Sequence, residues 1–152
     1  MPVLETRYFG TIEYEESAVL EFPRGLPGFD ERRRFVATRL AASDPLVYLQ
    51  SLEEPGLCFI TAPAAAVAPG YRLEADAEDL ELVGLPPERQ PEIGKEALCL
   101  IVLSMRETGP TANLLAPVIV NLGNRKAVQA IAQRPGYSHQ HALEPEEAPV
   151  CS

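Results

Sequence analysis

Short apolar segments that alternate with proline- and glycine-containing turns constrain this chain more than any other feature. Fifteen prolines and ten glycines are spread through 152 residues, and proline interrupts both helices and central strands. Many short strands with frequent turns predict an antiparallel sandwich or barrel. The runs that have a strand-like pattern are residues 4–15, 18–22, 35–40, 47–52, 57–62, 71–74, 98–105, 118–122 and 125–131.

Three of these runs carry further detail. Side chains alternate between two faces along residues 4–15, which predicts one half-buried strand with a bulge or bend at Gly10. Residues 98–103 are apolar on both faces and are therefore expected at the centre of the sheet. Gly123 and Asn124 separate two alternating runs, which predicts a two-residue hairpin turn.

Helical signals are few and local. Residues 76–83 have Asp76 as a possible N-cap, acidic residues in the first turn and Gly84 at the end. Residues 63–67 can add one helical turn that begins at a proline, and three prolines make residues 84–97 a loop. The chain is therefore expected to be a mainly β, compact antiparallel β-barrel-like single domain with one or two short peripheral helices. We expect this domain to span residues 1–134, and residues 135–152 to form a flexible acidic tail with prolines.

Charge and cysteine content limit the possible partners and compartment. A formal net charge of −9 opposes direct binding to a phosphate backbone, so no direct nucleic-acid contact is expected. The longest apolar run, residues 97–103, is too short to span a bilayer, and the first residues lack a secretory pattern. Cys58, Cys99 and Cys151 form no CxxC motif, which favours reduced thiols in a cytoplasmic protein without a membrane contact.

No arrangement of residues predicts catalysis, a cofactor or a metal site. The two histidines, His139 and His141, stand in the expected tail without a strong third ligand. Cys58 and Cys99 lie in apolar runs, which favours buried thiols over nucleophiles. The acidic pairs at 15–16, 53–54, 78–79 and 146–147 are interpreted as solvated charge, and the basic run at 32–34 as surface ion pairs. The alternatives are a small β-barrel enzyme or ligand-binding domain that uses a buried cysteine or a carboxylate pair, and a structural subunit with an apolar face.

Two segments call for a specific interpretation. Residues 21–30 combine two prolines and two glycines with apolar side chains, so they form either a loop anchored in the core or a preorganised contact surface. Residues 111–122 are apolar apart from Thr111, Asn113 and Asn121, and Pro117 indicates a strand start, an edge or a bulge. This second segment is either a core strand entered through a bend that Asn113 caps, or an edge that invites a partner.

At these segments the sequence resembles the FliW family of bacterial flagellar assembly factors. The matching pieces occur in the family's order and frame residues 4–131, whereas the loop at 84–97 and the tail depart from the family pattern. The pieces are TRYFGTIE (6–13), FPRGLPGF (22–29), YLQSLEEP (48–55) and TANLLAPVIVNL (111–122), followed by Asn124 and Arg125.

The resemblance implies a compact β-barrel-like protein without catalytic activity that works by partner exchange. Its implied partners are flagellin, bound through flagellin's C-terminal helical region, and the translational repressor CsrA, so that flagellin synthesis is coupled to flagellin export. We expect the chain to be monomeric when alone. The residues expected to contact a partner are Phe22, Pro23, Gly25, Leu26, Pro27, Gly28, Phe29, Asn113, Leu114, Leu115 and Pro117.

Overall fold

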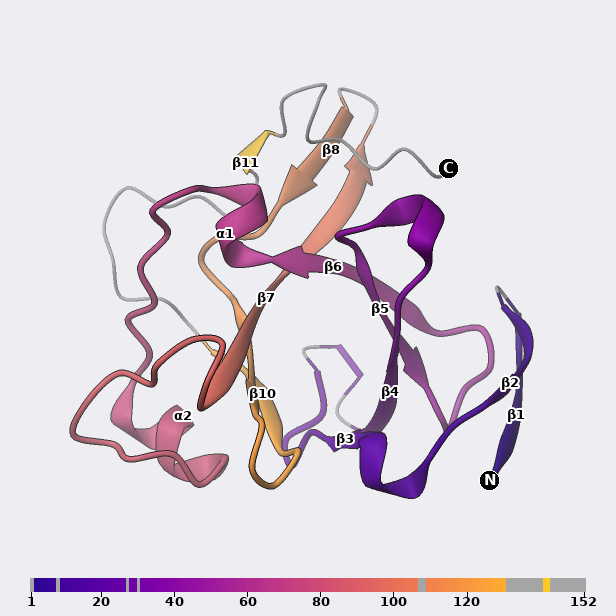
Figure 1. The fold of residues 1–152 in the computed structure, drawn as a ribbon, viewed down its shortest axis with the longest axis horizontal. Helices are drawn as coiled ribbons and strands as arrows, with labels where there is room; N and C mark the ends of the chain where they lie inside the picture. Colours follow the sequence, from indigo (N-terminus) through magenta and orange to yellow (C-terminus); the bar gives the residue numbers. More distant parts are fainter. Residues whose placement is uncertain are drawn as a thin grey trace.

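One antiparallel sheet curves into a nearly closed barrel (Figure 1). The computed structural model describes residues 2–7, 9–26, 28–29, 31–106, 109–130 and 141–142. The strand order around the barrel is β10-β9-β7-β6-β5-β4-β3. The apolar pattern of β7 predicts a central position; β7 is an interior strand between β9 and β6, and the middle place belongs to β6. The barrel strands are β3 Val19–Glu21, β4 Arg34–Thr38, β5 Val47–Ser51, β6 Cys58–Pro63, β7 Ala97–Arg106, β9 Val118–Asn121 and β10 Ala127–Gln129.

The barrel closes where its first and last strands meet. Glu21 and Lys126 form an isolated parallel bridge, and the Glu21 N–H donates to the Arg125 carbonyl at 2.9 Å. We call this contact between β3 and the two residues just before β10 the seam, and refer to it as the β3–β10 contact. All other neighbouring barrel strands are joined by antiparallel ladders of several residues.

The N-terminal segment folds as a hairpin, so the prediction of one strand over residues 4–15 is wrong. Its strands are β1 Val3–Thr6 and β2 Gly10–Glu13. Gly10 adopts φ +66°, and the Thr6 hydroxyl accepts a hydrogen bond from the Phe9 N–H and donates one to the Gly10 carbonyl. The expected bend at Gly10 is thus a full reversal of the chain.

Two further expectations fail for identifiable reasons. Residues 71–74 form no strand, because at the neighbouring Ala75 the backbone N–H and C=O bind the side-chain amide of Gln90 in place of a neighbouring strand. The β9–β10 connection spans residues 122–126, five residues where a two-residue turn was predicted. Its Arg125 N–H donates to the Asn121 carbonyl at 2.8 Å, and Arg125 adopts φ +63°.

Beyond the barrel, β7 continues into a short arm. The strand β8 Gly109–Ala112 pairs with the end of β7, and β11 His141–Ala142 pairs with β8. Residues 131–140 and 143–152 lie outside the described part of the chain, so the flexible tail at 135–152 stays a prediction.

The helices are short and lie at the periphery (Figure 1). They are η1 Glu16–Ala18, η2 Ala41–Ser43, α1 Ala64–Val67 and α2 Ala77–Leu82. The prediction of α2 is confirmed, with Asp76 as N-cap and a glycine, Gly84, at φ +82°. The Leu85 N–H donates to the Leu80 carbonyl and the Gly84 N–H to the Glu81 carbonyl, which is the Schellman arrangement. Among the described residues, no helix is long and apolar enough to cross a bilayer.

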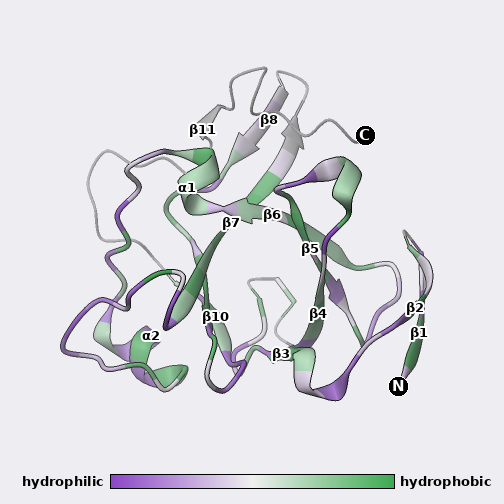
Figure 2. Cartoon of the chain, in the orientation of Figure 1, coloured by the Kyte–Doolittle hydropathy of each residue, from purple (hydrophilic) through white to green (hydrophobic). Residues whose placement is uncertain are grey.

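Two apolar cores lie on opposite faces of the sheet. The inner core fills the barrel with side chains such as Phe35, Leu49 and Val118, whereas the outer core packs Ile101 and Leu80 beneath α1 and α2. Figure 2 shows hydrophobic residues following the barrel strands, while the loop after α2 is mostly hydrophilic. The mainly β, barrel-like fold with two short α-helices confirms the predicted fold class.

Candidate functional site

Residues 22–26, 28 and 29 lie in a loop over the inner core, and we call them the plug loop. Phe22 is fully buried and its ring meets Phe35 edge to face, with centroids 5.3 Å apart. Leu26 is 2% exposed. Gly25 adopts φ +67° and donates its N–H to the Phe22 carbonyl at 2.8 Å, a left-handed geometry that favours glycine. These residues fit the interpretation of a loop anchored in the core.

Phe29 brings aromatic surface to the outside of the same loop. Its side chain is 38% exposed, and its ring meets Phe59 at 5.5 Å between centroids. Phe59 in turn contacts Phe35 at 5.9 Å, so a row of rings runs from the inner core to the surface. Pro23 is half-buried and Gly28 is exposed, while Pro27 lies outside the described residues.

An ion pair that the sequence did not reveal ties the plug loop to α2. The Arg24 guanidinium lies 2.7 Å from the Asp79 carboxylate. Asp79 is buried, so the interpretation of the pair at 78–79 as solvated charge is wrong for this residue. The sequence offered one hint that Asp79 is buried: it stands four positions before Val83, on the same side of α2, and next to Leu80, and both of these residues are buried.

The second expected segment folds as a capped bend. The Asn113 side-chain carbonyl accepts the Leu115 N–H at 3.1 Å, and Asn113 and Leu115 are half-buried. Leu114 and Pro117 are buried, and the Leu114 carbonyl accepts the Tyr71 hydroxyl at 2.8 Å. Leu114 belongs to the outer core, whereas Phe22 and Leu26 of the plug loop belong to the inner core. The bend at 111–117 therefore packs into the outer core and the plug loop into the inner core, while Val118 and Val120 of the strand that follows the bend also belong to the inner core.

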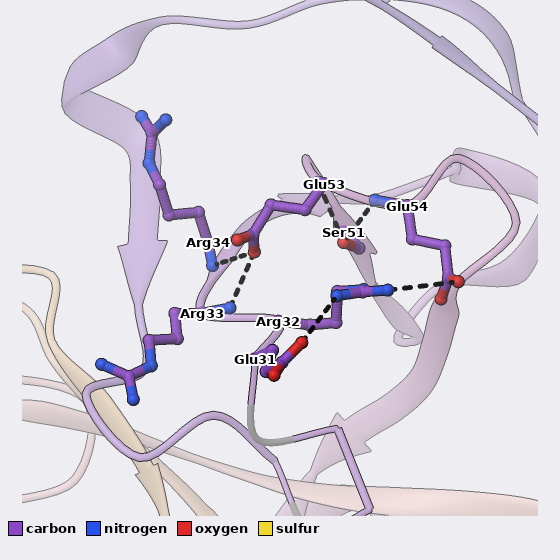
Figure 3. Close-up of polar contacts among 7 residues, drawn as sticks. All are labelled: Glu31, Arg32, Arg33, Arg34, Ser51, Glu53 and Glu54. Carbon is purple, nitrogen blue, oxygen red and sulfur yellow. Dashed lines mark hydrogen bonds and ion pairs between the residues drawn. The ribbon is translucent and has the colours of Figure 1, made fainter.

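The turn after β5 organises the chain next to the plug loop (Figure 3). One oxygen of the Glu53 carboxylate accepts the backbone N–H groups of Arg33 and Arg34, at 2.7 and 3.0 Å. The Ser51 hydroxyl oxygen accepts the N–H groups of Glu53 and Glu54, at 3.1 and 3.0 Å. This network locks the start of β4 against the β5–β6 turn.

The basic run beside this turn is neutralised by carboxylates. Arg34 pairs with Glu16 at 3.0 Å, and Arg32 lies 3.7 Å from Glu54 and 4.0 Å from Glu31. Figure 3 shows the side chains of Arg33 and Arg34 directed away from Glu53. The prediction of surface ion pairs is confirmed for Arg32 and Arg34, and such exposed pairs contribute little to stability.

The thiols of the barrel are poorly suited to nucleophilic chemistry. Desolvation raises the pKa of the half-buried Cys58 thiol to about 11 and the pKa of the buried Cys99 thiol to about 12. Both side chains are therefore protonated at neutral pH, and the thiolate is the reactive form. Within the described ranges, no three histidine, cysteine or carboxylate side chains are grouped as metal ligands would be.

These features define a small antiparallel β-barrel protein whose β3–β4 loop packs into the inner core. The model of the FliW protein family matches residues 3–143, and the chain belongs to this family of flagellar assembly factors. The predicted family is thereby confirmed.

Named relatives and a solved structure agree over nearly the whole chain. The flagellar assembly factor FliW of Bacillus velezensis is 31% identical over 141 residues, which cover 93% of this chain and 96% of that protein. The FliW of Heliobacterium modesticaldum is 29% identical over 145 residues, covering 95% and 92%. A crystal structure of the flagellar assembly factor FliW superimposes with a TM-score of 0.81 at 30% identity, covering 95% of this chain and 99% of that one.

Proposed function

We propose that this flagellar assembly factor binds flagellin and antagonises the translational repressor CsrA, so that flagellin synthesis follows flagellin export. It acts in the cytoplasm through protein–protein contacts and carries out no bond chemistry. The observation that carries the proposal is Phe29, an exposed aromatic side chain on an anchored loop. Exposed aromatic residues with rigid support are frequent energetic centres of protein interfaces.

The expected contact residues divide into two groups by burial. Pro23, Gly28, Phe29, Asn113 and Leu115 keep accessible surface, so they form the contact surface itself. The other described members, Phe22, Gly25, Leu26, Leu114 and Pro117, are buried and hold the backbone of that surface in shape. Pro27 completes the first segment but lies outside the described residues.

Preorganisation supports a binding role for the plug loop. Phe22 and Leu26 fasten the first half of the loop in the inner core, and Glu53 fixes the backbone that follows the loop at Arg33 and Arg34. A surface that is ordered before binding loses little conformational entropy when a partner arrives. The chain can therefore bind with a small contact area.

The acidic net charge supports a basic partner, and the unreactive thiols support a non-catalytic role. The net charge of −9 speeds association with a basic protein such as an RNA-binding repressor. The raised pKa values of Cys58 and Cys99 oppose the alternative of a cysteine-dependent enzyme. Partner exchange, in which one bound protein replaces another, requires neither a cofactor nor a metal.

Binding measurements with the host's flagellin and CsrA test the proposal. We expect calorimetry to detect both partners at micromolar or lower concentration and Phe29→Ala to weaken at least one of them about tenfold or more. Leu40→Ala is the matched control, because Leu40 is 40% exposed but lies beside η2, away from the plug loop in sequence. Failure of the unmodified chain to bind either protein would contradict the proposal.

Asn113→Ala tests the second segment separately. This variant removes the cap on the Leu115 N–H and reshapes the bend. If binding is lost in Asn113→Ala but not in Phe29→Ala, the contact surface lies on the 111–117 bend alone.

A further inference from the structure

The seam is the weakest junction of the barrel. In the described part of the chain, β3 and β10 share one bridge, Glu21 with Lys126, and the Glu21 N–H donates to the Arg125 carbonyl. The neighbouring pairs β3–β4 and β10–β9 have registers of three residues each. With so few backbone hydrogen bonds, the seam needs support from elsewhere in the fold.

The helix α2 is fastened to the β10 side of the seam. The side-chain amides of Asn121 and Asn124 both donate to the Val83 carbonyl, at 2.8 and 2.9 Å. Val83 is the C-cap of α2; Asn121 is the last residue of β9, and Asn124 lies within the β9–β10 turn. The last turn of the helix is therefore bound to the hairpin that carries Lys126.

The same helix is fastened to the β3 side of the seam. Asp79, one helical turn before Val83, pairs with Arg24 at 2.7 Å, and Arg24 follows β3 by three residues. Figure 1 shows α2 next to the β9–β10 turn. The polar contacts thus form a closed circuit from β3 through the plug loop and α2 to the β9–β10 turn.

Removing Arg24 alone is unfavourable, because Asp79 is largely buried and would keep its charge without a partner. The Asp79 side chain is 11% exposed and the Arg24 side chain 52% exposed. Separated, Arg24 regains water readily, whereas Asp79 remains a poorly hydrated charge within the protein. States in which only some of these contacts are broken are therefore less favourable than the state with all contacts formed or the state with all contacts broken.

We propose that α2 is a clasp across the seam, and that α2, the plug loop and the β3–β10 contact open and close as one unit. The closed form is the structure described above. The open form uncovers Leu20 and Ala127, buried inner-core residues on either side of the seam. The barrel thereby has a built-in switch between a sealed and an open seam. The inference concerns the chain without partners and does not depend on what it binds.

Amide hydrogen exchange of the full chain, followed by NMR, tests the proposal. In Arg24→Met we expect the amides of Glu21, Leu80 and Leu85 to exchange about tenfold faster or more, by the same factor. Amides in the β6–β7 ladder should keep their rates. Arg34→Met is the matched control, because it removes an exposed pair, Arg34 with Glu16 at 3.0 Å, that does not cross the seam.

Two outcomes would overturn the clasp. If only the α2 amides accelerate and Glu21 does not, the helix is a peripheral element without a hold on the seam. If every amide accelerates equally, the variant has lost global stability and no local unit exists.

Two further variants keep the test decisive if Arg24→Met folds poorly. Asp79→Asn leaves no buried charge, so its acceleration should be smaller than that of Arg24→Met yet occur at the same amides. A disulfide in the double variant E21C/K126C joins the exposed bridge partners directly. In that background, Asp79→Asn should no longer accelerate exchange near the seam, while α2 still responds; continued acceleration of β3 would contradict the proposal.

Discussion

Gly84 and the side chain of Asn124 lie so close that a Cβ at Gly84 would stand 2.9 Å from Asn124 Nδ2. That amide donates to the Val83 carbonyl at 2.9 Å, and Gly84 itself adopts φ +82°. The space and the backbone conformation both demand glycine at this position.

Gly84→Ala should lower the free energy of unfolding by about 1.5–3 kcal/mol, from a left-handed alanine and a displaced hydrogen bond. Urea unfolding measures the loss. Gly94→Ala is the control, because Gly94 also has a positive φ, +94°, but a Cβ added there would meet no other atom within 4 Å. Gly94→Ala should lower the free energy of unfolding only by the cost of a left-handed alanine, about 1 kcal/mol. Equal decreases in the two variants would show that the Asn124 contact contributes nothing.

The two ends of the plug loop should respond differently to truncation. Phe22 is fully buried, so Phe22→Ala should cost about 3–5 kcal/mol of unfolding free energy. Phe29 is 38% exposed, and Phe29→Ala should cost no more than about 1.5 kcal/mol. Thermal unfolding of both variants checks this ratio, and a larger loss in Phe29→Ala would mean that Phe29 anchors the loop.

Glu96 should titrate at unusually low pH. Arg89 holds the pKa of Glu96 at about 2, chiefly by a two-pronged hydrogen bond at 2.7 and 2.8 Å, with help from the Glu92 N–H. Because the folded pKa is lowered, the stabilisation is complete above the unfolded pKa near 4.5 and is lost as the pH falls towards 2. NMR titration should show the Glu96 pKa rising in Arg89→Met and unchanged in Lys95→Met.

The barrel cysteines should react slowly with disulfide reagents. In a Cys151→Ser background, we expect Cys58 to react before Cys99, because Cys58 is half-buried and Cys99 is buried. Both rates should rise with pH, since only the thiolate attacks and the pKa values lie at about 11 and 12. Cys58→Ser should remove the faster phase; fast labelling of Cys58 at pH 7 would revive the alternative of a reactive cysteine.

Local signals in the sequence predicted much of the fold. The helix α2 was predictable because its cap residue, acidic first turn and terminal glycine are neighbours in sequence. The interior place of β7 in the sheet followed from apolar residues on both faces. The hairpin at residues 3–13 was missed because alternation continues through its turn, so the pattern of a hairpin equals that of one strand.

Features of the candidate site that depend on long-range contacts could not be predicted from the sequence. Leu26 and Phe29 are both apolar loop residues three positions apart, yet one is buried and the other is partly exposed. That difference depends on how the loop meets Phe59, a strand residue thirty positions later. Asp79 was interpreted as solvated because its partner Arg24 is even more remote, 55 positions away in sequence. No pattern within a short window could reveal either contact.

The position of the seam also has a consequence for synthesis on the ribosome. Strands β3 to β7 pair with their neighbours in chain order, so they can assemble progressively as the chain emerges. Glu21 must wait for Arg125 and Lys126, almost the whole domain later. A nascent chain therefore carries an unclosed barrel until residues 125 and 126 have been made.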